Sequence, residues 1–440
     1  MNIPLNDPFP SVTKADWIAQ VAKDLKDPNA YNTLHWHTPE GFTAEPFYTT
    51  DDLNELPLAE IQAAQKAAPG WLNAPAYEVV DGSEVDYRDA LRAGADALVL
   101  RNAVFQNRAG VDLAVLENRV TARLLNGIKL SETPVFFQTN QPAADFVLDL
   151  KRVIPYQLQG GLLSPPDNTT AEATHLTMDS PRFRTVCVSG HEFHNAGATA
   201  TQELAFTLAR LVDTYDQLTE QGLTVEQLVP KTIFSLSVGT SYFIEIAKLR
   251  ALRVLVAKLL RAYSSTVSCV LLAVHCTTST FYESTATPYT NMLRATTEAM
   301  SAVVGGCDIL TVRPYDGLFS EPSEFSHRIA RNVSLLLKHE SYLDKVADPS
   351  AGSFYIEMLT HQLIESAWGL FQDVEKQGGL AKATDFVQAE LDRSYAAKVE
   401  AVREGKVLVG VNKFRFDEGG HVGSAKPNEV AGRRLAEEFE

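Results

Sequence analysis

Short apolar runs alternate with amphipathic stretches along most of this chain. From about Pro75 onward each run is roughly four to eight residues long and leads into a helical pattern, as a buried parallel strand leads into its crossover helix. We predict eight strands: Ala76–Val80, Ala97–Arg101, Pro134–Gln138, Leu158–Leu163, Thr185–Ser189, Ile233–Val238, Ser268–His275 and Ile309–Arg313. The pattern therefore indicates an α/β protein.

Helical periodicity between and after these runs supports the same fold class. The stretch Ser241–Leu260 is apolar around most of its circumference, which predicts a helix buried on more than one side. Three long helical patterns follow the last strand: Glu324–Lys338, Tyr355–Lys376 and Leu380–Val402. Eight strands with helices between them fit a (β/α)8 TIM barrel better than an open sheet. An open doubly wound sheet is the alternative.

The pattern divides the chain into three parts. We predict an N-terminal arm at 1–70, the barrel at 71–340 and a C-terminal helical extension at 341–440. In the arm, Thr13 and Asp16 have the spacing of a capping box at the start of a helix. The segment Leu34–Leu53 is dense in aromatic residues, proline and turn residues, and it cannot form a core of its own. We expect it to lie on another surface, that of a second subunit.

Composition and charge exclude several classes of protein. The net charge of −16 argues against nucleic acid and anionic lipid as partners, because both are negatively charged. No apolar run reaches the roughly 18–20 residues that a bilayer requires, and the start of the chain lacks the pattern of a signal peptide. We expect a cytoplasmic protein that does not cross a membrane. The four cysteines lack the spacing of a zinc site or a disulfide scaffold, so we expect buried free thiols.

Candidate chemistry is concentrated in the loop Ser189–Gly197. It holds His191, Glu192, His194 and Asn195 close together at the end of a predicted strand, where α/β barrels gather reacting groups. The spacing of the two histidines is compatible with a metal cluster, but a metal site needs further ligands and we expect none. The chain has no Gly-rich phosphate loop.

Several motifs follow one another along nearly the whole chain. They are L-H-W-H-T-P-E-G-F at Leu34–Phe42, S-G-H-E-F-H-N-A-G-A-T-A at Ser189–Ala200, E-I-A-K-L-R-A at Glu245–Ala251, A-V-H-C-T-T-S at Ala273–Ser279, R-I-A-R-N at Arg328–Asn332, D-P-S-A-G-S-F-Y at Asp348–Tyr355 and G-V-N-K-F at Gly410–Phe414. In sequence and in order, these motifs resemble the methylmalonyl-CoA mutase family. The resemblance implies an acyl-CoA-binding barrel, followed in active chains by a cobalamin-binding domain with a D-x-H-x-x-G motif. This sequence lacks that motif, so we expect the chain itself to bind no cofactor.

The barrel departs from the pattern of active family members at three places. Where they carry a Tyr-His pair after Ser-Gly, this chain has His191 and Glu192. The family's histidine donates a hydrogen bond to the thioester carbonyl, whereas an ionised glutamate can only accept one. A segment of the family rich in arginine and tyrosine is replaced by Gly70–Val80, and Thr277 replaces the glutamine of H-C-Q-T-S. The resemblance therefore implies no catalytic residue, with His191 and Glu192 as degenerate equivalents.

Among these mutases, the chain looks like the small subunit of a heterodimer. This implies a non-catalytic partner of a homologous large subunit, with adenosylcobalamin in that subunit or in the complex, and leaves a homodimer of the isolated chain open. The alternative is a catalytic barrel that uses a separate cobalamin-binding chain. A third hypothesis, CoA binding without chemistry, requires an open channel along the barrel axis. The candidates for substrate contacts at the barrel mouth are His275, Thr277 and Arg313.

Overall fold

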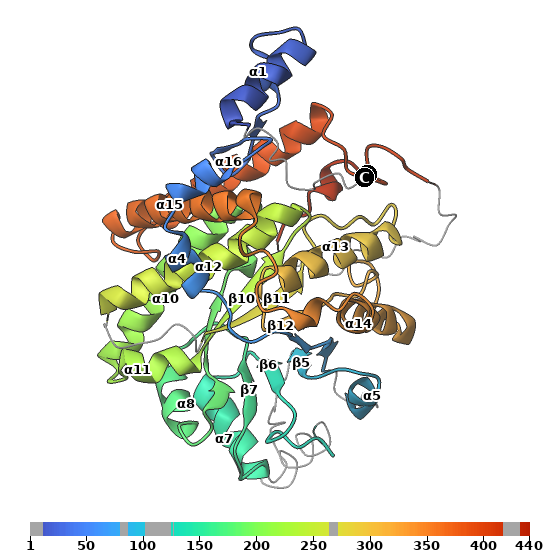
Figure 1. Ribbon diagram of the computed structural model, residues 1–440. Coiled ribbons are helices and arrows are strands. Elements are labelled where there is room, and N and C mark those ends of the chain that lie inside the picture. Colours follow the sequence, from blue (N-terminus) through green and yellow to red (C-terminus); the bar gives the residue numbers. More distant parts are fainter. Residues whose placement is uncertain (1–11, 80–86, 102–124, 126, 264–271, 417–431) are drawn as a thin grey trace, which may run out of the picture.

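Strands and helices alternate in the computed structural model, which describes residues 12–79, 87–101, 125, 127–263, 272–416 and 432–440. The strands are β1 (Trp36–His37), β2 (Thr43–Ala44), β3 (Leu72–Asn73), β4 (Ala76–Glu78), β5 (Leu98–Arg101), β6 (Val135–Gln138), β7 (Gln159–Leu162), β8 (Arg182–Arg184), β9 (Val186–Ser189), β10 (Thr232–Val238), β11 (Ala273–Thr278) and β12 (Ile309–Thr311). The first helices are α1 (Lys14–Asp24), α2 (Ala30–Thr33), α3 (Thr50–Asn54), α4 (Leu58–Ala63), α5 (Tyr87–Arg92), α7 (Ala143–Val153), α8 (Thr170–Leu176) and α9 (His191–Asn195). The later helices are α10 (Ala200–Glu220), α11 (Val225–Leu228), α12 (Tyr242–Tyr263), α13 (Thr290–Val304), α14 (Glu324–His339), α15 (Phe354–Lys376) and α16 (Thr384–Arg403). Parallel strands enclosed by helices fit a TIM-barrel-like fold (Figure 1).

The parallel strands form two five-stranded sheets that share two segments of the chain. One sheet has the order β3-β12-β11-β10-β9 and the other the order β4-β5-β6-β7-β8. Residues between β3 and β4 bond to both sheets, because Ala74 N donates to Leu310 O at 2.9 Å and Val99 N donates to Pro75 O at 3.0 Å. At the other junction, β8 and β9 are separated by Thr185 alone. Each broken strand therefore takes part in both sheets.

All eight predicted strand regions contain observed parallel strands, but the seventh strand is displaced. The run predicted as Ser268–His275 forms β11 at Ala273–Thr278 instead, and residues 268–271 lie outside the described part of the chain. The polar pair Thr277 and Thr278 looks like the end of a strand in the sequence. In the structure both threonines are buried, because strand side chains in a barrel point either to the interior or to the helices.

Helices cover the outer face of the strands and carry the main core. The largest hydrophobic cluster lies around α10, α12 and α15, and α12 packs on α10, α13 and α15. This confirms the prediction that Ser241–Leu260 is buried on more than one side. Within α12 the side chain of Arg250, 1% exposed, pairs with Glu357 at 2.7 Å and with Asp348. A second, smaller cluster covers β5–β8.

The glycine pair in β7 is required by the close approach of neighbouring strands. A Cβ atom on Gly160 would lie 1.9 Å from the carbonyl oxygen of Val135 in β6, and one on Gly161 would lie 2.3 Å from that of Arg184 in β8. Any side chain here would push the neighbouring strand away. The pair therefore has a packing role.

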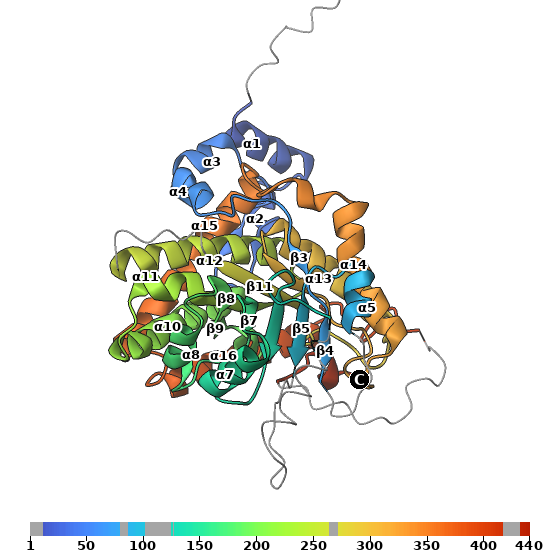
Figure 2. The ribbon, with the colours of Figure 1, turned by 90° about the horizontal axis from the view of Figure 1, so that it is seen from below.

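The N-terminal segment separates into a projecting part and a packed part. The capping box of α1 is confirmed, since Thr13 N donates to the Asp16 carboxylate at 3.0 Å and Asp16 N donates to Thr13 Oγ1. No residue of α1 is buried, and the helix projects from the body of the molecule (Figures 1 and 2). Later arm residues pack on the chain's own helices, as Ile61 is fully buried in the main cluster. Within Leu34–Leu53, Ala44, Tyr48 and Leu53 are buried, whereas Trp36 and Phe47 are each 41% exposed. The contact of this segment with another subunit stays a prediction.

Two further expectations concern cysteines and membrane spans. Cys187, Cys276 and Cys307 are buried and free, which confirms the expected thiols at these three positions, while Cys269 lies outside the described residues. In the described part of the chain, no helix is both long and apolar enough to cross a bilayer.

Candidate functional site

Alternation along β10 turns two serines toward the barrel interior. Phe234 and Leu236 belong to the cluster beneath the helices, whereas Ile233 belongs to the cluster inside the barrel. Because strand side chains point alternately to opposite faces, Ser235 and Ser237 face inward with Ile233. Both serines are only 2% exposed. The interior is therefore apolar at one end and polar toward the carboxyl ends of the strands.

Buried hydrogen bonds connect the inward-facing polar groups across the barrel. We call this chain of hydrogen bonds the axial relay, and its members are Ser237, His191, Ser235, His275, Thr311 and the carbonyl of Ala74. His191 Nδ1 lies 2.8 Å from Ser237 Oγ, and its Nε2 lies 2.7 Å from Ser235 Oγ. Ser235 Oγ lies 2.7 Å from His275 Nδ1, and His275 Nε2 lies 3.0 Å from Thr311 Oγ1. Thr311 donates to Ala74 O at 2.7 Å.

The carbonyl at the end of the axial relay determines the direction of every bond. A carbonyl oxygen can only accept, so the hydroxyl proton of Thr311 points to Ala74. His275 must then donate from Nε2 to Thr311, and its Nδ1 accepts the proton of Ser235. By the same reasoning His191 donates from Nε2 to Ser235 and accepts from Ser237 at Nδ1. Both histidines are therefore neutral Nε2–H tautomers.

Burial keeps these histidines neutral. Burial, with a smaller effect from Arg101, lowers the pKa of His275 to about 3. Burial and the nearby ring of His275 hold the pKa of His191 well below its usual value. A proton on Nδ1 of His275 would also leave the hydroxyl proton of Ser235 without its acceptor in the axial relay. Near neutral pH the barrel interior therefore carries no histidine charge.

Glu192 points away from the barrel interior. Its side chain is 60% exposed and forms an ion pair with Arg210 of α10. Arg210 also donates to Ser189 O at 2.7 Å and lies over the ring of Phe193. Of the two adjacent residues singled out in the sequence, His191 lies in the barrel interior and Glu192 lies on its outer side.

His194 belongs to a separate buried network behind the same loop. Its Nε2 lies 2.7 Å from Ser279 Oγ, and its Nδ1 lies 3.4 Å from Glu203. Lys248, whose side chain is 0% exposed, pairs with Glu203 at 2.7 Å and with Glu245 at 2.6 Å. Burial alone would lower the pKa of Lys248, but the two carboxylates outweigh it and raise that pKa. This network fixes the loop rather than presenting it to a ligand.

The C-terminal part of the chain covers the loops at the carboxyl ends of the strands. Lys398 of α16 donates to Gly197 O at 2.7 Å, and Arg433 N donates to Asn195 O at 2.7 Å. Leu435, 1% exposed, packs with Phe281 and donates its N–H to Phe281 O at 2.8 Å. Residues far apart in the sequence thus close this side of the barrel mouth.

The remaining sequence candidates lie at or near the barrel mouth. His275 is part of the axial relay, Thr277 is buried on the same strand, and Arg313 follows β12. Sequence reasoning missed Ser235 and Ser237, although serines at alternate positions of an apolar strand were a usable signal.

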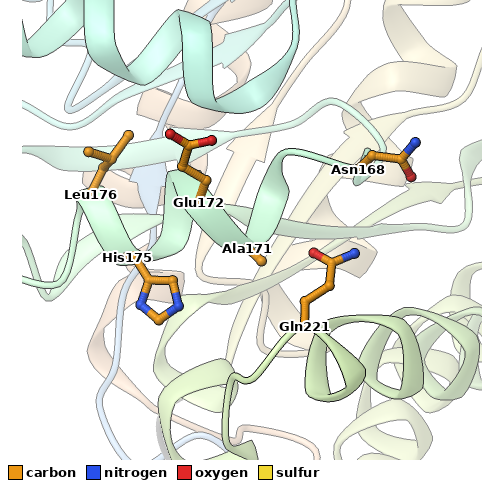
Figure 3. Close-up of a pocket in the computed structure, with 6 residues that line it drawn as sticks. All are labelled: Asn168, Ala171, Glu172, His175, Leu176 and Gln221. Carbon is orange, nitrogen blue, oxygen red and sulfur yellow. The ribbon is translucent and has the colours of Figure 1, made fainter.

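Other possible sites lie outside the barrel interior. A surface cavity of about 600 Å³ lies between α8 and the end of α10 (Figure 3), and it contains none of the candidate residues. Its lining includes His175, Glu172 and Gln221. Within the described residues, no group of three or more His, Cys, Asp or Glu side chains is arranged to hold a metal ion.

Comparisons with known proteins agree with the motif pattern. A family model described as methylmalonyl-CoA mutase matches residues 158–437. The chain is 32% identical to methylmalonyl-CoA mutase of Rhizobium meliloti (strain 1021), over 92% of this chain and 64% of that protein. It is 31% identical to the methylmalonyl-CoA mutase small subunit of Porphyromonas gingivalis (strain ATCC BAA-308 / W83), over 92% of this chain and 70% of that protein. Among solved structures, 7,8-dihydropteroate synthase from Vibrio fischeri ES114 has a TM-score of 0.33 and 14% identity, covering 60% of this chain and 92% of that chain.

Proposed function

The chain belongs to the methylmalonyl-CoA mutase family, and from this premise we propose that it is the small, non-catalytic subunit of an adenosylcobalamin-dependent mutase. In this role it supports a homologous large subunit, and the complex interconverts methylmalonyl-CoA and succinyl-CoA. The similarity to a chain named as a small subunit supports the assignment. A homodimer of the isolated chain is compatible with it.

The axial relay is the observation that carries this proposal. Stabilising charge on a thioester oxygen requires a hydrogen-bond donor aimed at that oxygen. In the axial relay the protons of both histidines and of all three hydroxyl groups are already used within the barrel. Glu192, at the position of the family's catalytic histidine, is turned toward Arg210. Neither His191 nor Glu192 is placed to assist the reaction.

The same side chains argue against CoA binding along the barrel axis. His275 is 3% exposed, and Ser235 and Ser237, the serines on either side of His191 in the axial relay, are each 2% exposed. An extended acyl-CoA arm would have to break several of these hydrogen bonds and leave their partners unsatisfied, at a cost of about 1–3 kcal/mol for each group. We therefore do not favour CoA binding without chemistry.

The barrel histidines do not fit a ligand role toward the cobalt of cobalamin. Such a role needs an imidazole nitrogen that is free to bind metal. His191 and His275 have both nitrogens in the axial relay, and His194 has both in contact with Ser279 and Glu203. We therefore assign adenosylcobalamin to the partner subunit or to the complex.

We also propose that the two sheets close into one (β/α)8 barrel, with an N-terminal arm at 1–70, the barrel at 71–340 and a C-terminal helical extension at 341–440. The pairings run from β4 through β5, β6 and β7 to β8, and from β9 through β10, β11 and β12 to β3. Because each broken strand continues from one sheet to the other, these pairings return to their starting point.

The function is tested by reconstitution. Conversion of methylmalonyl-CoA to succinyl-CoA is measured with adenosylcobalamin and with this chain, a homologous large subunit, or both. We expect no turnover by this chain alone and a stable complex with the large subunit. Turnover by this chain with a separate cobalamin-binding protein, lost in Glu192→Gln or His191→Asn, would instead establish the alternative of a catalytic barrel.

A further inference from the structure

Two arginines point into the barrel mouth from strands on either side of the first strand. Arg101 is the last residue of β5, and Val99 two residues earlier lies in the interior cluster. On β12, Ile309 lies in the interior cluster and Thr311 joins the axial relay, so Arg313 is the next inward-facing position. Between them lies the broken strand, which pairs with β12 through β3 and with β5 through β4.

Among the described residues, these two guanidinium groups have one recorded ion pair, that of Arg101 with Glu78 at the adjacent position of β4. The carboxylate recorded nearest to Arg101 is that of Glu78, at 4.0 Å, and its side chain is 43% exposed. No ion pair of Arg313 is recorded in the described part of the chain. The acid that interacts with it, Glu283, is 2% exposed, and burial raises the pKa of its carboxyl to about 8. Near neutral pH Glu283 is thus mostly uncharged.

The arginines also act on each other and on the axial relay below them. Burial, and after it the charge of Arg313, lower the pKa of Arg101 to about 9. Arg101 in turn contributes to the low pKa of His275. The two positive charges and the neutral histidine therefore share one poorly solvated region. Positive charge that is only partly compensated in such a region is costly unless a further opposite charge joins it.

A hydrogen-bond donor lies in the same part of the interior. Thr277 is 6% exposed, and its Oγ1 has no hydrogen-bond partner among the described residues. In the β11–β12 register Thr277 is opposite Thr311, which is one inward position before Arg313. The hydroxyl groups of the axial relay are all used, whereas that of Thr277 is not.

We propose that the barrel mouth binds a small oxyanion, a carboxylate or phosphate group, between Arg101 and Arg313 with the Thr277 hydroxyl as a further donor. Guanidinium groups match the planar or tetrahedral arrangement of such oxygens better than any other side chain. The axial relay forms the floor of this site, so the ligand is small and does not extend down the axis. The site belongs to the isolated chain and requires neither catalysis nor a partner subunit.

The proposal is tested by titrating the protein with inorganic phosphate and, separately, with succinate, at constant ionic strength held with chloride. Thermal unfolding and isothermal calorimetry are followed. Because a ligand that binds only the folded state stabilises it, we expect a saturable rise in Tm with at least one of the two. The two titrations distinguish a phosphate ligand from a carboxylate ligand.

Substitutions test whether Arg101, Arg313 and Thr277 form the oxyanion site. Arg101→Met and Arg313→Met should each weaken binding about 10- to 100-fold, the loss expected for a charge-assisted hydrogen bond. Thr277→Val keeps the side-chain shape and should weaken it about five-fold. The matched control is Arg182→Met, which removes one positive charge from β8 at the opposite end of the strands. Circular dichroism of each variant checks that it is folded.

Three outcomes would overturn the site: no saturable effect of either anion, an equal loss in Arg182→Met, or full binding by a folded Arg101→Met, Arg313→Met double variant. None of them bears on the subunit role, which is tested by complex formation and turnover.

Discussion

The rings of His191 and His275 meet edge to face inside the barrel, with centroids 6.2 Å apart and an angle of 74° between the ring planes. The hydroxyl group of Ser235 accepts a hydrogen bond from the ring of His191 and donates one to the ring of His275. A change in the protonation of either ring therefore disturbs the hydrogen bond of the other.

The neutrality of His275 predicts acid sensitivity. Its pKa is about 3 in the folded chain against 6.5 for an unperturbed histidine, so between these values the unfolded state binds more protons. The contribution of His275 to the free energy of unfolding is fully present above pH 6.5. It is lost as the pH falls toward 3, by up to about 5 kcal/mol. Urea unfolding measures how far the free energy of unfolding falls between pH 7 and pH 4.5. This fall should be smaller in His275→Gln than in the wild type. The surface variant His175→Gln should show the same fall as the wild type. An equal fall in the free energy of unfolding of the wild type and both variants would contradict a neutral His275 in the folded chain.

Removing the hydroxyl of Ser235 should destabilise the barrel more than a usual Ser→Ala change. Ser235→Ala leaves one donor on His191 and one acceptor on His275 without a partner, at a cost of roughly 2–4 kcal/mol in the free energy of unfolding. The control is Ser341→Ala at an exposed position, which should change it by less than about 0.5 kcal/mol. In addition, ¹⁵N NMR of the wild-type imidazoles should show both rings as Nε2–H tautomers. Finding either ring as the Nδ1–H tautomer would refute the direction of the axial relay.

Glu192 should be dispensable for the reaction of the complex. Its side chain is exposed and its ion pair with Arg210 is on the surface, so Glu192→Gln should change the free energy of unfolding by at most about 1 kcal/mol. Mutase turnover of the reconstituted complex should be unchanged. The matched substitution of the corresponding histidine in the large subunit should abolish turnover. A loss caused by Glu192→Gln in a normally assembled complex would speak for catalysis in this chain.

Acyl-CoA should bind weakly to the isolated chain. With the axis filled by the axial relay, we expect no dissociation constant below about 100 μM, equivalent to roughly −5.5 kcal/mol. Calorimetric titration with methylmalonyl-CoA measures it directly. A micromolar dissociation constant would mean that the barrel interior opens to admit the ligand, and it would contradict a barrel axis filled by the axial relay.

Deletion of residues 1–29 should impair assembly with a large subunit without unfolding the barrel. The deletion removes α1, which has no buried residue, and leaves the packed part of the arm, including Ile61, in place. Light scattering of the mixed subunits reports assembly, and circular dichroism reports folding. The control deletes residues 1–11 alone and should assemble normally. If the longer deletion assembles equally well, α1 does not contribute to the subunit contact.

The sequence predicted the strands well because buried parallel strands are short apolar runs between helices. It could not predict the breaks at β3–β4 and β8–β9, which follow from pairing with two different neighbours rather than from local composition. It also displaced β11, because the buried threonines Thr277 and Thr278 look like the end of a strand. The axial relay was missed for a related reason: Ser235 and Thr311 acquire their role only when separate strands bring them beside the histidines. Adjacent residues such as His191 and Glu192 gave no indication of which one turns inward.

The division of the parallel strands into two sheets affects how the protein loses structure. The strands from β4 to β8 are contiguous in the sequence, and β5–β8 and their helices have their own small hydrophobic cluster, while β9–β12 lie beneath the larger one. Contiguous segments with a separate core commonly open as one cooperative unit. Amide hydrogens of β5–β7 should therefore exchange together and earlier than those of β10 and β11. Transient opening of this protein would then begin in one half of its fold while the histidines at its centre remain in the protected half.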